Sequence, residues 1–85
     1  MSSRMNAIDE LLAVVSAFAE ARQLSESRVS TLVFGEGTRL KHLREGGDMG
    51  ARRVARGLSW LSANWPNGAQ WPADVTRPHT AEETV

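Results

Sequence analysis

Apolar residues recur at spacings of three and four in two long stretches of the chain, and each stretch predicts an amphipathic helix. The first runs from about Asn6 to Arg22, with Asp9 and Glu10 in its first turn. Its apolar positions are Ile8, Leu11, Leu12, Val15, Phe18 and Ala19. We expect this helix to form one wall of the core.

The second long stretch runs from about Met49 to Asn64, where Asp48 is expected to cap the helix and Pro66 to stop it. Its apolar stripe consists of Val54, Leu58, Leu61 and Trp65, while Arg52, Arg53 and Arg56 lie mostly off the stripe. Trp60 is expected to be a core residue.

Between these stretches, residues 24–47 read as two short helices joined by a glycine-marked turn. Ser25 is expected to cap a helix from about Glu26 to Phe34. Val29, Leu32 and Val33 lie at spacings of three and four in it, and we expect them to be buried together on one side.

After Gly35 and Gly37, Thr38 is the expected N-cap of a helix of about two turns. Leu40 and Leu43 are expected to face inward, and Arg39, Lys41, His42 and Arg44 to stay outside. The pair Gly46-Gly47 is expected to end this helix.

No segment alternates apolar and polar residues long enough to predict a strand, so we expect a compact all-α domain of four to five helices over residues 1–65. Residues 66–85 are expected to form an extended arm with a frayed tail from about His79. The pair Trp-Pro occurs twice here, beginning at Trp65 and at Trp71, six residues apart. Its tryptophans are expected to pack on apolar surface, either of the same domain or of a second subunit.

The formal net charge is zero, but the charges are unevenly distributed. Residues 22–57 hold eight bases and four acids, which gives 8 − 4 = +4, and each end of the chain carries −2. A basic centre between acidic ends suits a protein that meets phosphate with one face. The alternative is that these are ordinary solvated charges.

The sequence shows none of the common catalytic or metal-binding patterns. There is no cysteine, and the two histidines, His42 and His79, have no metal-binding companions. Phosphate-binding glycine motifs and a plausible Ser/His/Asp set are also missing, so we expect no enzyme activity, no metal and no cofactor. Without a long apolar run or a signal-peptide pattern, we expect a soluble, cytoplasmic protein with no membrane partner.

The glycine-joined helices resemble the helix-turn-helix regulators of the lambda-repressor/Cro (XRE-like) type. The residues that match are Val29, Ser30, Val33, Leu40 and Leu43, and the resemblance covers roughly residues 8 to 64. One departure is that Phe34 stands where the motif has its turn glycine, and Gly37 is an additional glycine. The turn is therefore expected to be longer than usual.

The resemblance implies a transcriptional regulator of a phage or integrative mobile element, a repressor or repressor-activator. We expect it to bind a double-stranded operator with inverted repeats as a homodimer. Expected base contacts are Thr38, Arg39, Lys41 and His42, and expected phosphate contacts are Ser25, Ser27, Arg28, Arg44, Arg52 and Arg53. The expected dimer interface is the end of the last helix with the arm, through Leu61, Trp65 and Trp71.

Other interpretations stay open. The arm could bind a toxin if the protein were a DNA-binding antitoxin, and the helical pair could be a docking surface for another protein, which zero net charge would favour. Ser25 could act only as a helix cap, and Arg39, Lys41 and His42 could simply be solvated.

Overall fold

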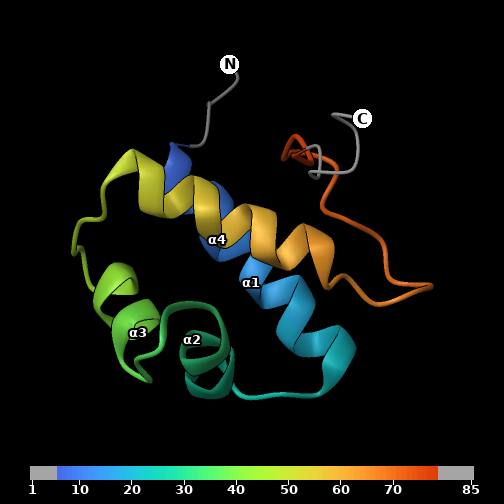
Figure 1. Ribbon diagram of the computed structural model, residues 1–85, viewed down its shortest axis with the longest axis horizontal. Helices are drawn as coiled ribbons and strands as arrows, with labels where there is room; N and C mark the ends of the chain where they lie inside the picture. The colour runs from blue at the N-terminus through green and yellow to red at the C-terminus, as the bar shows by residue number, and fades with distance from the viewer. Residues whose placement is uncertain (1–5, 79–85) are drawn as a thin grey trace.

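The computed structural model describes residues 6–78 and contains four helices in that part of the chain (Figure 1). They are α1 (Ala7–Arg22), α2 (Glu26–Phe34), α3 (Arg39–Arg44) and α4 (Ala51–Ala63). The two long helices α1 and α4 pack on each other, and the short pair α2 and α3 lies together below α4 in Figure 1. The expectation of an all-helical chain is confirmed for residues 6–78, which hold no strand.

Helix α1 begins and ends on local signals. The Asn6 side chain accepts a hydrogen bond from the backbone N–H of Asp9 at 2.8 Å. At the other end Gln23 adopts a left-handed conformation with φ of 58°. The N–H of Leu24 then donates to the carbonyl of Ala19 at 2.9 Å, which satisfies one of the free carbonyls of the last turn.

Helix α2 has the bounds that the sequence predicts, because a serine cap starts it and a glycine ends it. The Ser25 hydroxyl accepts from the N–H of Arg28 at 3.1 Å, and Gly35 turns the chain with φ of 79°. The prediction that Leu32 is buried is wrong, since Leu32 is 43% exposed. Ser30 is buried instead, and two residues along a helix are about 160° apart around its axis, so its burial turns Leu32 outward.

Helix α3 is short and is held mainly by its neighbours. Thr38 occupies the N-cap position, but its side chain makes no capping hydrogen bond. Leu40 and Leu43 are buried as expected. At the C-terminus the N–H of Gly47 donates to the carbonyl of His42 at 2.8 Å, across a glycine at position 46 with φ of 100°.

Helix α4 begins two residues later than the sequence predicts, at Ala51. Asp48 does not cap it, because the Asp48 carboxylate accepts from the adjacent Met49 N–H at 2.9 Å. Gly50 is the N-cap and supplies no side chain. The extended stretch before it carries the chain from the end of α3 to the start of α4.

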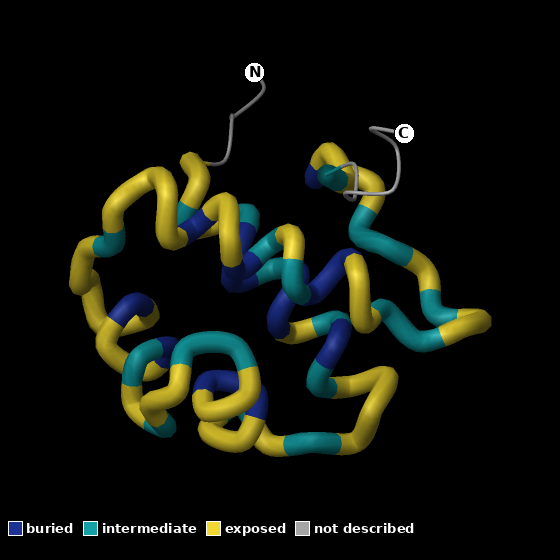
Figure 2. Tube along the Cα trace, viewed as in Figure 1, coloured by how far each residue is buried: buried dark blue, intermediate teal, exposed yellow. Residues whose placement is uncertain are grey.

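The core lies between the inward faces of all four helices (Figure 2). Helix α1 supplies more of the buried hydrophobic side chains than any other helix, and α4 contributes the buried glycine Gly57. Val54 and Leu61 are buried as expected, whereas Leu58, Trp60 and Trp65 are only partly buried against the core. The buried hydrophobic side chains are Leu11, Leu12, Val14, Val15, Phe18, Val29, Leu40, Leu43, Val54, Leu61 and Val75.

The chain after α4 folds into two similar turns, where the sequence predicted an extended arm. The N–H groups of Ala69 and Val75 donate to the carbonyls of Pro66 and Pro72. The indole N–H of the tryptophan before each proline donates to the same residue's carbonyl, at 2.9 Å for Ala69 and 2.8 Å for Val75. The expected tail from residue 79 lies outside the described residues.

Aromatic packing and hydrogen bonds join this segment to the helices. The Trp65 ring lies 5.9 Å from the Phe18 ring and 4.8 Å from the Trp71 ring, measured between centroids. Arg77 donates from Nε to the Ser62 hydroxyl at 2.8 Å and from its terminal nitrogen to the Ser62 carbonyl at 2.8 Å. The segment therefore packs on its own domain.

Candidate DNA-binding surface

Helix α3 presents two basic side chains away from the core. Because Leu40 and Leu43 are buried, helix geometry turns Lys41 and His42 to the opposite side, and both are exposed. Thr38, just before the helix, is exposed as well. Three of the four expected base-contacting residues thus share the outer side of α3.

The fourth expected base contact, Arg39, lies on the flank of α3. Its guanidinium is 3.3 Å from the Glu36 carboxylate in the preceding turn, and 26% of its side chain is exposed. The Nε atom is buried and has no hydrogen-bond partner within residues 6–78. Arg39 would have to leave Glu36 to reach a base.

The start of α2 lies beside the turn that leads into α3. A Cβ placed on Gly37 would be 3.1 Å from the Ser27 hydroxyl, so the two backbones approach closely there. Ser25 and Arg28 are exposed at the same end of α2. The Ser25 hydroxyl already serves as the helix cap, whereas Arg28 makes no side-chain hydrogen bond within residues 6–78.

Arg44, expected to contact phosphate, joins three helices. Its Nε lies 2.7 Å from a carboxylate oxygen of Glu26 at the start of α2. Its terminal nitrogen donates to the Ser16 hydroxyl of α1 at 2.8 Å. The side chain is still 42% exposed, so the guanidinium is held at the surface.

The first turn of α4 carries the other two expected phosphate contacts. Arg52 and Arg53 are both exposed. The Arg53 guanidinium lies 5.9 Å from the centre of the Phe34 ring, at the end of α2. Phe34 in turn lies over Gly57 of α4, which ties the arginine-bearing helix to α2.

The residues expected at a dimer interface already pack against the core of their own chain. Leu61 has no exposed surface. Trp65 and Trp71 are partly exposed, with both indole N–H groups bonded to backbone carbonyls of their own segment. Only the tryptophans therefore have surface to offer to a partner.

Sequence reasoning missed the role of Phe34, although an isolated glycine within a helical pattern, Gly57, is a signal of close packing.

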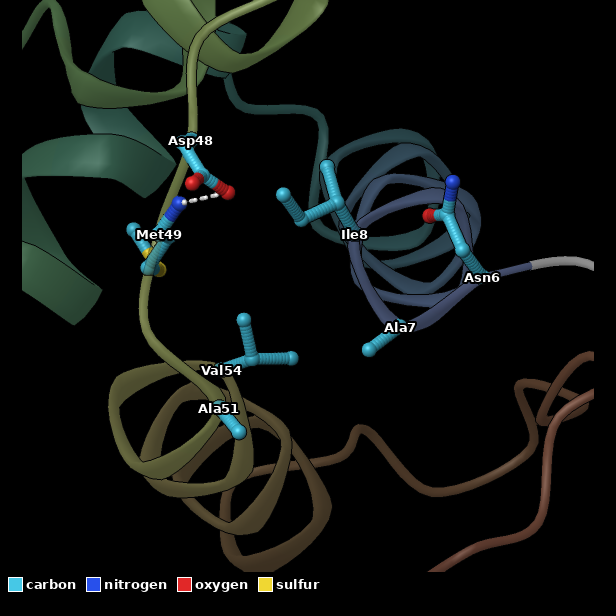
Figure 3. Close-up of a pocket in the computed structure, with 7 residues that line it drawn as sticks. All are labelled: Asn6, Ala7, Ile8, Asp48, Met49, Ala51 and Val54. Atoms are coloured by element: carbon cyan, nitrogen blue, oxygen red, sulfur yellow. Dashed lines mark hydrogen bonds between the residues drawn. The ribbon is translucent and has the colours of Figure 1, made fainter.

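Sequence reasoning also missed a pocket of about 340 Å³ between the start of α1 and the loop before α4 (Figure 3). The two polar side chains that line this pocket, Asn6 and Asp48, are both bonded to backbone N–H groups. Its other lining is apolar, so no set of polar groups converges there.

Comparisons with protein families, with curated proteins and with solved structures found no match. Among residues 6–78, no helix is both long enough and apolar enough to cross a membrane. The same residues hold no group of three or more acidic, histidine or cysteine side chains placed to bind a metal ion.

Proposed function

We propose that this protein is a sequence-specific DNA-binding transcriptional regulator that acts as a homodimer on an inverted repeat. The observation that supports this best is the arrangement of α2 and α3. Helix α3 is anchored by Leu40 and Leu43 and exposes Lys41 and His42. The turn before α3 approaches the start of α2, where Arg28 is exposed. A short anchored helix with an exposed basic side is suited to the major groove.

In this proposal Lys41 and His42 contact base edges, and Thr38 contacts a base or a phosphate. Lys41 donates to guanine O6 or N7, and His42 can donate or accept at the same edge. Arg28, Arg52 and Arg53 bind the phosphate backbone. Arg39 joins the base contacts only if DNA replaces Glu36 as its partner.

Pairing of two chains follows from the small reach of α3. A helix of six residues touches only a few base pairs, so a second copy adds to the specificity of a single half-site. Two-fold symmetry then requires half-site centres about 10 base pairs apart, or a near multiple. Trp65 and Trp71 are the proposed contacts between subunits. The role in a phage or mobile element rests on the sequence resemblance alone.

A binding assay with matched variants tests the proposal. Duplexes selected from a random pool by the protein should bind more tightly than unselected DNA. Lys41→Gln should reduce this preference by about 1–3 kcal/mol, because one good base contact is lost. Arg22→Gln, which removes one charge from the last turn of α1 but no expected base contact, should leave the preference unchanged. Absence of any selected sequence at low salt would refute the proposal.

A protein-interaction module is the second candidate, and the exposure of Leu32 favours it. Among residues 6–78, Leu32 is the one large hydrophobic residue that is exposed, on the outer side of α2. Under this alternative Leu32→Ser would abolish binding of the partner protein and would not change DNA binding. Under the leading proposal Leu32→Ser would alter DNA binding little.

A further inference from the structure

The turn between α2 and α3 is organised by one buried hydroxyl, that of Ser30. Ser30 lies on α2 and has no exposed surface. Its hydroxyl donates to the carbonyl of Glu36 in the turn and accepts from the N–H of Leu40 at 3.2 Å. The Ser30 side chain therefore makes hydrogen bonds both to the connection between α2 and α3 and to the first helical turn of α3.

The bond to Leu40 does the work of a helix cap. The cap residue of a helix normally accepts a hydrogen bond from the second or third N–H of the helix. Thr38 occupies that place in α3 and makes no such bond, and Leu40 is the second residue of α3. The acceptor comes instead from α2, ten residues earlier in the chain.

We propose that Ser30 is a positioning residue for DNA recognition, which sets the direction of α3 by capping it from α2 and by fixing the lengthened turn. The inference rests on the proposed function. Helix α3 has six residues, too few to be stable alone, so its direction depends on what holds its ends. Arg44 holds the far end through Glu26 and Ser16, and Ser30 holds the near end.

Loss of the hydroxyl affects base contacts more than phosphate contacts. In Ser30→Ala the Leu40 N–H stays in a buried place without an acceptor, so the turn must shift to expose it. The shift rotates Lys41 and His42 relative to the rest of the surface. Arg28 and Arg52 lie on other helices and keep their positions.

The experiment compares Ser30→Ala with Ser62→Ala. Ser62 is the other buried polar residue within residues 6–78, and its hydroxyl, near the end of α4, accepts from Arg77. Affinity is measured for a selected half-site duplex and for random DNA, so that pairing of subunits does not enter. We expect the ratio of the two affinities to fall about tenfold in Ser30→Ala, with affinity for random DNA unchanged, and not to fall in Ser62→Ala.

Amide hydrogen exchange supplies a readout that does not depend on DNA. In the unmodified protein the Leu40 N–H should exchange as slowly as core amides such as that of Val15. In Ser30→Ala the exchange rate of the Leu40 amide should be at least tenfold higher than the rate expected from the loss of global stability alone. An unprotected Leu40 amide in the unmodified protein, or an unchanged affinity ratio in Ser30→Ala, overturns the inference. Failure of the unmodified protein to select any DNA overturns the proposed function, while the exchange data decide the cap separately.

Discussion

Replacement of Gly57 by alanine tests how closely α2 and α4 approach. A Cβ at position 57 would lie 2.9 Å from Phe34 Cζ, 3.3 Å from Phe34 Cε1 and 3.4 Å from Leu11 Cδ1. Alanine within a helix is favoured over glycine by about 1 kcal/mol, whereas overpacking a core costs about 1–3 kcal/mol. The contact with the ring outweighs the helix preference, so Gly57→Ala should destabilise the protein by up to about 2 kcal/mol.

The sign of the effect should reverse when the ring is removed. In a Phe34→Ala background, Gly57→Ala should stabilise the protein by about 1 kcal/mol, since only the helix preference remains. Urea and thermal unfolding followed by circular dichroism measure this, because about 1 kcal/mol moves the Tm of a chain this size by about 4–8 °C. Ser59→Ala, at an exposed position of α4, should have the same small effect in both backgrounds. Equal effects of Gly57→Ala in both backgrounds would refute the packing argument.

Three further predictions concern α3, α1 and the segment after α4. Leu40→Ala should cost about 2–5 kcal/mol in unfolding free energy and His42→Ala almost nothing, and equal melting curves would mean that α3 is oriented differently. Gln23→Gly should raise stability by about 0.5 kcal/mol, because it relieves the left-handed conformation, and a lower Tm would contradict this. A chain ending at Asn64 should be a monomer in light scattering if the tryptophans join two subunits, and a persisting dimer would move the interface to the helices.

Local sequence signals predicted the helices well. Ser25 and Gly35 determine both ends of α2 through a cap and a positive φ, and neither depends on distant residues. The i, i+3 pair Leu40 and Leu43 likewise determines which side of α3 is buried. These features were predictable because the interactions lie within one turn of the chain.

The errors arose where distant residues decide. Leu32 fits an apolar stripe as well as Val33 does, and only the burial of Ser30 under α3 selects between the two faces. Asp48 is a good cap in isolation, but the loop from α3 places it two residues too early. For the candidate site, the sequence predicted correctly that Lys41, His42 and Arg44 are exposed, whereas Arg39 is only partly exposed. It did not predict that Arg39 and Arg44 each have an acidic partner.

The repeat of Trp-Pro at an interval of six has a structural explanation that composition alone did not suggest. Each proline carbonyl accepts from the N–H three residues later, and each preceding indole N–H bonds the carbonyl of that same residue. The turn is thus encoded locally and then repeated. Val75, the last residue of the second turn, is buried in the core and so holds the segment against the helices.

The last prediction concerns whether Arg44 stays paired with Glu26 or binds a DNA phosphate. Its pair with Glu26 takes up one base and one acid, so the net charge of +4 over residues 22–57 is unchanged. The long-range attraction that the proposed DNA binding would use is therefore unchanged as well. Each cation that binds a phosphate contributes about −0.9 to the slope of log affinity against log salt. If Arg28, Arg52 and Arg53 bind phosphates while Arg44 stays on Glu26, the slope per chain is about −2.7, and Arg44→Ala leaves it unchanged. If DNA draws Arg44 away from Glu26, the slope is about −3.6 and Arg44→Ala reduces it by about 0.9. A salt titration of both proteins on random DNA therefore separates an arginine that positions α3 from one that binds phosphate.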